Sequence, residues 1–140
     1  MKKEEEKRLA TDASLSEKVR KGDLFAAPCP SRHVLKHVCS QWGVLALMAL
    51  REHEVMRFSE LRRKLAGVSE KMLAQSLQAL VADGFVSRKS YAVVPPRVEY
   101  RLTPMGEEIA EHVANLADWI ECNMPRVMEV RRSAELETDK

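Results

Sequence analysis

The chain has 140 residues, of which 45% are apolar and 31% are charged, and its 23 Lys and Arg against 21 Asp and Glu give a net charge of +2. This length predicts one domain that can bury a core without disulfide or metal supports. The sequence contains no disulfide framework and no apolar run long enough to span a bilayer, and its charged first residues, without an apolar segment, argue against a signal peptide. We therefore expect a cytoplasmic protein.

Charge is unevenly distributed along the chain. Residues 57–101 contain nine Lys and Arg and four acids, a net charge of +5, whereas residues 102–125 contain five acids and no Lys or Arg, a net charge of −5. Such segregation is typical of a protein with one surface that meets a polyanion. Chance clustering of charge on solvated surfaces is the alternative.

The N-terminal part is expected to contain an extension and two helices. Residues 1–24 are charged and weakly patterned, and we interpret them as an extension that is partly disordered or helical. The segment FAAPCP predicts a loop, and Pro30 suits the first turn of a helix over residues 30–40. The stretch WGVLALMALRE is apolar nearly all round and predicts a central helix over residues 41–52.

Two short helices joined by a tight turn are expected next. After the extended segment VMRF, Ser59 is the predicted N-cap of one helix and Gly67 its stop. After the turn GVS, Ser69 is the predicted N-cap of the second helix, which Gly84 ends. This layout is that of a helix-turn-helix.

The second of these helices carries an unusual polar face. Leu73, Leu77 and Leu80 form the stripe expected to be buried, and the opposite face offers amides, hydroxyls and a lysine with almost no acid. A helix in the major groove needs side chains that pair with base edges, and acids there would repel phosphates. An ordinary surface helix of low charge is the alternative. The candidate base-reading residues are Ser69, Lys71, Met72, Gln75, Ser76 and Gln78.

A β-hairpin should follow. Alternating residues predict strands over residues 85–91 and 97–102, with Val86 outward or intermediate, and the two prolines of AVVPP belong in the loop because they cannot donate to a ladder. A stiff hairpin beside a helix-turn-helix is a wing. Its bases, with those of the preceding short helix, could contact phosphates, or could simply lie on a solvated surface. The candidate backbone contacts are Arg62, Arg63, Lys64, Arg88, Lys89 and Arg97.

The last expected helix begins at Pro104, with Thr103 as its N-cap, and extends to about Asn123. Residues 125–140 are interpreted as a charged tail. The order of elements predicts a mainly α fold with a small β-hairpin: a winged helix-turn-helix with additional N- and C-terminal dimerisation helices. The residues expected at the dimer interface are Val34, Val113, Leu116, Trp119 and Ile120.

Several ordered motifs resemble the HxlR-type family of winged-helix transcriptional regulators, and within it the YtfH-like members. They are CPSRHVLKHVCSQWGVLALMALRE, RFSELRRKLAGVSEKMLAQSLQALVADGFVSRKSY, VPPRVEYRLTPMGEEI and LADWI, and the similarity as a whole runs from about Phe25 to Asn123, within the domain assigned to residues 25–124. The resemblance implies a homodimer that binds operator DNA, with its interface built by the first and last helices. It also places the candidate readers on the recognition helix. Ser76 stands where many members carry a larger basic residue, so the family's base preference is not transferred.

Cys29 occupies the position of the family's N-terminal cysteine, which in some members senses oxidants or electrophiles. A thiol at a helix N-terminus near Arg32 could be reactive, or Cys29 could have only a structural role. Cys39 and Cys122 are expected to be buried. Cys29, His33 and His37 lie four residues apart and could bind a metal, but no fourth ligand is evident, and histidines on a dimer-facing or solvent-facing helix are the alternative.

These patterns favour a sequence-specific DNA-binding transcriptional regulator that acts as a homodimer on a near-palindromic operator. Redox or electrophile sensing through Cys29 is a candidate trigger. The alternative is a winged-helix protein-interaction module that does not bind DNA. The sequence contains no P-loop, zinc-protease motif or nucleophile elbow, so we expect no enzyme and no cofactor. Double-stranded DNA and a second copy of the chain are the expected partners.

Overall fold

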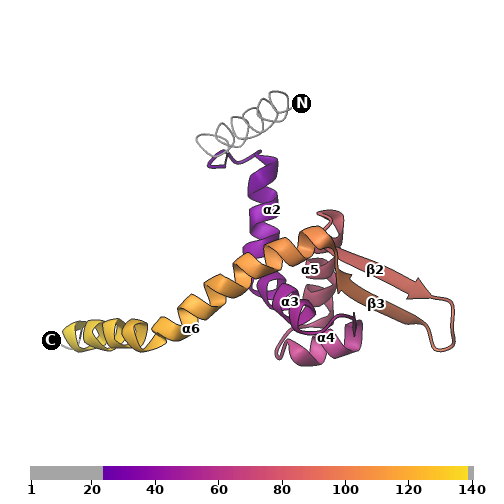
Figure 1. Cartoon of the computed structure of the whole chain (residues 1–140). Coiled ribbons are helices and arrows are strands. Elements are labelled where there is room, and N and C mark those ends of the chain that lie inside the picture. Colours follow the sequence, from indigo (N-terminus) through magenta and orange to yellow (C-terminus); the bar gives the residue numbers. More distant parts are fainter. Residues whose placement is uncertain (1–23, 139–140) are drawn as a thin grey trace, which may run out of the picture. The chain divides into compact units, whose positions relative to one another are not determined.

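The computed structural model describes residues 24–138 (Figure 1). The predicted extension over residues 1–24 lies outside the described residues, apart from Leu24. The chain divides into two units, Met1–Ser40 and Gln41–Lys140, and each is described by itself. No helix within residues 24–138 is long and apolar enough to cross a membrane.

In the first unit, helix α2 spans Pro30–Cys39, one residue shorter than expected. Cys29 is its N-cap residue and Pro30 opens its first turn. The Arg32 guanidinium donates a hydrogen bond of 3.1 Å to the carbonyl oxygen of Phe25, which fixes the loop before the helix. Cys29 and Val38 are buried.

In the second unit, helix α3 spans Gln41–Glu52 as predicted, and it supplies much of the core. Its residues Ala46, Leu47 and Leu50 are buried, and it packs against α4, α5, α6 and β3, whose bounds are given below. A helix that is apolar nearly all round needs such a central place, since every face must find a partner.

The helix-turn-helix consists of α4, Phe58–Lys64, and α5, Glu70–Ala82. The N-cap prediction is confirmed for α5, where the Ser69 hydroxyl accepts a 3.1 Å hydrogen bond from the Met72 amide. It is wrong for α4, where Arg57 is the N-cap residue. The Arg57 amide donates to the Glu60 carboxylate at 3.0 Å, so the acid at the third position of α4 caps the amide of the N-cap residue.

Each short helix is followed by a glycine with positive φ: Gly67 at 93°, in the turn after the α4 C-cap Leu65, and Gly84 at 85°, directly after the α5 C-cap Asp83. At the end of α5 the Gly84 amide donates to the Val81 carbonyl and the Phe85 amide to the Leu80 carbonyl. These two bonds form a Schellman motif, which reverses the chain directly into the sheet.

The sheet has three antiparallel strands in the order β1-β3-β2, where β1 is Met56–Arg57, β2 is Val86–Tyr91 and β3 is Arg97–Leu102. The wing hairpin is confirmed, and the short segment before α4 adds a third strand to it. The expectation for Val86 is wrong: it is only 2% exposed, because its pairing with Leu102 puts it on the sheet face that also carries the buried Tyr100 and Met56.

Helix α6 spans Pro104–Thr138, so the predicted end near Asn123 is wrong and the segment interpreted as a tail is helical up to Thr138. Pro125 lies inside it. A proline removes one backbone donor, and the residues that follow are mostly good helix formers, so the helix continues.

Two hydrogen bonds join Thr103, before α6, to the segment that ends α5, and a third caps α6 itself. The Thr103 hydroxyl accepts from the Gly106 amide at 3.0 Å and donates to the Gly84 carbonyl at 2.5 Å, and the Thr103 amide donates to the Phe85 carbonyl at 3.0 Å. The recognition helix and the last helix therefore share one junction.

Candidate nucleic-acid interface

Helix α5 buries its leucine stripe and exposes its polar face. Leu73, Leu77 and Leu80 are buried against the rest of the unit, which turns the opposite side of the helix to solvent. Of the six candidate readers, five are exposed, whereas Ser76 is half-buried and reaches less far outward. The exposed five are Ser69, Lys71, Met72, Gln75 and Gln78.

The three bases of α4 are all exposed, but two of them already face acids. Arg62 lies 3.9 Å from Glu70, and the Lys64 ammonium lies 3.3 Å from Glu52. Among the described residues, Arg63 forms no ion pair. Because exposed pairs of this kind are weak, all three bases can still meet phosphates.

The wing divides its bases between two faces of the sheet. Ladder pairing and the alternation of β-strands place Lys89, Tyr91 and Arg97 on one face, together with Glu99. Arg88 lies on the opposite face with the buried Tyr100, although the Arg88 side chain itself is exposed. Arg88, Lys89 and Arg97, which the sequence groups together on the wing, therefore do not form one surface.

A compact cluster surrounds Arg97. Its guanidinium carbon lies 4.5 Å from the centre of the Tyr91 ring, and its Nε lies 3.3 Å from Glu99 Oε1. The Nε atom is buried and makes no hydrogen bond, so the contact with Glu99 is an ion pair without hydrogen-bond geometry. The Lys89 ammonium lies 5.0 Å from the same ring centre. These contacts fix the position of Arg97.

Sequence reasoning missed Tyr91, Glu99 and Arg57 as members of this surface. Glu99 pairs directly with Lys89 on one side and with Arg57 on the other. Arg57 is 42 positions earlier in the chain than Glu99, and only the pairing of β1 with β3 brings them together. The alternation of residues along the hairpin could have revealed Tyr91 beside Arg97.

The apolar stripe expected on the last helix divides into a buried and an exposed part. Val113 is buried, whereas Leu116, Trp119 and Ile120 are 53%, 59% and 44% exposed. No residue of α6 from 115 to the last described position, 138, is buried. Val34 on α2 is half-buried. The part of α6 from residue 115 to residue 138 therefore carries several apolar side chains that are largely exposed.

The cysteines differ from expectation. Cys29 is 5% exposed, and Cys39 and Cys122 are exposed, so the predicted burial of the last two is wrong. Cys122 lies on the unburied part of α6, and Cys39 is the last residue of α2. The described part of the chain contains no group of three His, Cys, Asp or Glu residues that could hold a metal ion, so Cys29, His33 and His37 are not assembled as a site there.

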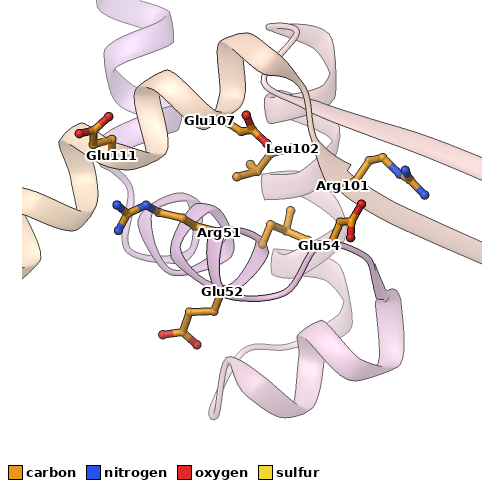
Figure 2. Close-up of a pocket in the computed structure, with 8 residues that line it drawn as sticks. Arg51, Glu52, Glu54, Arg101, Leu102, Glu107 and Glu111 are labelled. Atoms are coloured by element: carbon orange, nitrogen blue, oxygen red, sulfur yellow. The ribbon is translucent and has the colours of Figure 1, made fainter.

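A cleft of about 510 Å³ lies where the ends of α3 and β3 meet the start of α6 (Figure 2). Its charged groups do not converge on one point, because the guanidinium groups of Arg51 and Arg101 point to opposite sides of the cleft. Four acids also line it, so it does not extend the basic surface. The lining residues are Leu50, Arg51, Glu52, Glu54, Arg101, Leu102, Glu107 and Glu111.

A helix-turn-helix with an exposed amide-rich second helix and a basic three-stranded wing defines a winged helix-turn-helix DNA-binding protein. A model of the HxlR-like helix-turn-helix family matches residues 37–128. The chain belongs to this family, whose members are transcriptional regulators rather than enzymes.

Relatives agree with this assignment. The chain is 64% identical over 121 residues to the HTH-type transcriptional regulator YtfH of Escherichia coli strain K12, covering 86% of this chain and 95% of the relative. The solved structure of the transcriptional regulator YtfH from Salmonella typhimurium has a TM-score of 0.75 at 65% identity, over 80% of this chain and 99% of the other. The structure of the redox regulator HypR in its reduced form has a TM-score of 0.65 at 31% identity, and the match covers 71% of this chain and 98% of HypR.

Proposed function

We propose that this regulator binds a near-palindromic operator as a homodimer in the cytoplasm. The observation that carries the proposal is the coincidence of an exposed, nearly acid-free recognition face on α5 with a basic wing beside it. In this arrangement bases on the wing and on α4 supply salt-dependent affinity, and the polar face of α5 supplies the sequence readout.

The proposed readers are Lys71, Gln75 and Gln78, which are exposed, with Ser69 and Met72 at the start of the helix. Gln75 can pair bidentately with adenine, because its amide offers both a donor and an acceptor. The half-buried Ser76 is a short donor with little reach. The proposed phosphate contacts are Arg62, Arg63, Lys64, Arg88, Lys89 and Arg97.

The proposed dimer interface is the exposed apolar part of α6, with Leu116, Trp119 and Ile120 at its centre. Apolar side chains on this scale seldom stay in water on one helix face, and burial against a second copy would remove them. Val34 on α2 and Val113 on α6 stay predicted interface residues, although Val113 is buried within its own unit. A two-fold dimer presents its recognition helices to half-sites roughly 34 Å apart.

Selection of bound duplexes from a random pool tests the proposal and yields the operator. We expect an inverted repeat whose half-sites lie about one helical turn apart. The matched control is a variant with Lys71→Ala, Gln75→Ala and Gln78→Ala, which should enrich no sequence. Failure of the folded wild-type protein to enrich any duplex, together with salt-insensitive capture of a protein partner, would instead support the protein-interaction module.

We propose Cys29 as a redox or electrophile sensor. Its support is its place at the N-cap of α2 and the likeness to HypR, a redox regulator. Because the thiol is buried, reaction requires local opening around α2. Mild oxidant should lower operator affinity of the wild type and leave Cys29→Ser unchanged. The exposed Cys39 provides the control: Cys39→Ser should respond as the wild type does.

A further inference from the structure

The wing has an outer sheet face on which one acid stands among four bases. We define this face by Arg57, Lys89, Arg97, Arg101 and Glu99. Glu99 lies in the central strand, directly opposite Arg57 of β1 and Lys89 of β2. Arg97 and Arg101 lie two residues before and after it, and therefore point to the same side of the sheet. Glu99 is thus at the middle of a cationic surface.

The contacts of Arg97 engage the Nε edge and one flat side of its guanidinium, and not the edge that carries the two terminal nitrogens. The Nε edge faces Glu99 at 3.3 Å, and the guanidinium lies over the Tyr91 ring. Among the described residues, none hydrogen-bonds the two terminal amines of Arg97. A planar guanidinium fixed in this way needs little further ordering to bind a phosphate.

The Glu99 carboxylate also reduces the net positive charge of the outer sheet face. Non-specific binding to DNA depends almost entirely on cations that neutralise phosphates, so an acid at the centre of a basic face weakens it. Its side chain is only 16% exposed, since its neighbours cover it, and it remains close to Arg97 instead of turning into solvent. The charge of Glu99 does not affect the hydrogen bonds that α5 makes to base edges, because Glu99 lies on the sheet.

We propose that Glu99 is a specificity-determining residue of the wing: it positions Arg97 on Tyr91 for a phosphate contact and limits attraction to non-operator DNA. This inference rests on the proposed function. Glu99 is the acid among the four bases of the outer sheet face, and without it that face would only attract phosphates. Tyr91 is the positioning residue that provides the platform for Arg97.

The test compares wild type, Glu99→Gln and Glu108→Gln by fluorescence anisotropy with two labelled duplexes over a range of salt concentrations. One duplex carries the selected operator and the other a scrambled sequence. Glu108→Gln is the matched control, because it removes one exposed acid from α6, outside the sheet. Circular dichroism and thermal unfolding verify that each variant is folded, and glutamine keeps the shape of the Glu99 side chain.

We expect Glu99→Gln to bind the scrambled duplex at least about threefold tighter, with a salt slope steeper by about 0.9, as one more phosphate is neutralised. The operator should gain less, so the ratio of the two affinities falls. Unchanged or weaker binding of the scrambled duplex would overturn the proposal. An equal gain in Glu108→Gln would also overturn it, since net charge alone would then explain the effect.

Tyr91 supplies a second, independent measurement. Tyr91→Leu removes the ring under Arg97 and should weaken both duplexes alike, whereas Tyr91→Phe keeps the ring and should restore wild-type affinity. Equal loss in both variants would contradict the platform role. If the folded wild type binds neither duplex, the proposed DNA-binding function itself fails; if it binds both and these variants behave as wild type, only the present inference fails.

Discussion

Gly106 lies so close to the neighbouring backbone that it leaves no room for a side chain. A Cβ atom there would stand 1.8 Å from the Phe85 carbonyl oxygen, and that oxygen already accepts a hydrogen bond from the Thr103 amide. The obstacle is backbone, which cannot rotate away as a side chain can. The first turn of α6 would therefore have to separate from the end of α5.

Gly106→Ala should lower the free energy of unfolding by about 3 kcal/mol, the upper range for overpacking a close contact. Chemical denaturation followed by circular dichroism measures this change. Ala134→Ser provides the control, because it also adds one heavy atom to α6 but at an exposed position. An unfolding midpoint for Gly106→Ala equal to that of the control would show that the junction is looser than the contact indicates.

Two single-residue variants distinguish base reading from phosphate binding. Gln75→Ala should change the preferred base at one operator position and cost about 1–3 kcal/mol there, because a bidentate pair is lost. Arg97→Ala should weaken operator and scrambled duplexes about equally and flatten the salt slope by about 0.9. Anisotropy titrations with single-base operator variants measure both effects. Wild-type affinity in both variants at moderate salt would refute the assignment of these residues.

At the scale of elements, the wing has two chemically different faces. The outer sheet face carries Lys89 and Arg97 beside Glu99, and the opposite face carries Arg88 next to the residues that pack on the helices. A duplex that lies along one face contacts the bases of that face only. The division makes the contribution of each face separable by single substitutions.

Lys89→Ala should lower affinity for all duplexes more than Arg88→Ala does, because Lys89 adds to the field of Arg57 and Arg97. We expect the salt slope to flatten by about 0.9 for Lys89→Ala and by less for Arg88→Ala. Salt titrations on a scrambled duplex measure the difference. The reverse order would place the duplex on the opposite face of the wing.

Local sequence signals were enough to predict most elements of this fold. The leucine stripe and the Ser69 cap set α5, and Pro95 and Pro96 set the loop of the hairpin, because each of these effects acts over a few residues. The third strand, the Arg57–Glu99–Lys89 row and the burial of Val86 depend on pairing between distant segments, which periodicity does not encode. The continuation of α6 was not predicted, because that helix was assigned from its apolar stripe, whose last residue is Ile120.

At the scale of the whole molecule, the unburied part of α6 determines the proposed assembly. The helix contains five acids and no Lys or Arg before Pro125, whereas after it Arg126, Arg131 and Arg132 are accompanied by three glutamates. Two copies paired antiparallel would bring the acidic half of one helix alongside the arginines of the other. Their apolar residues would meet at the centre of that pairing.

Trp119→Asp should convert the dimer to a monomer, because a buried unpaired carboxylate would replace an aromatic anchor. Size-exclusion chromatography with light scattering measures the molecular mass. We expect the monomer to lose most of its affinity for the full operator and to bind one half-site as the wild type does. Glu121→Gln, a change on the same helix, should leave the mass unchanged; a dimeric Trp119→Asp would refute the interface.

The junction at Thr103 and Gly106 has a mechanical meaning for such a dimer. Because hydrogen bonds and a close backbone approach join the start of α6 to the end of α5, we expect the two helices to move together. In the proposed dimer, a small rotation of one α6 against the other would thus move each α5 along the duplex. A change in the crossing angle of the paired α6 helices would alter the distance between the two α5 helices, which would then no longer match one turn of the DNA. The operator would be released although the base-reading residues are unchanged.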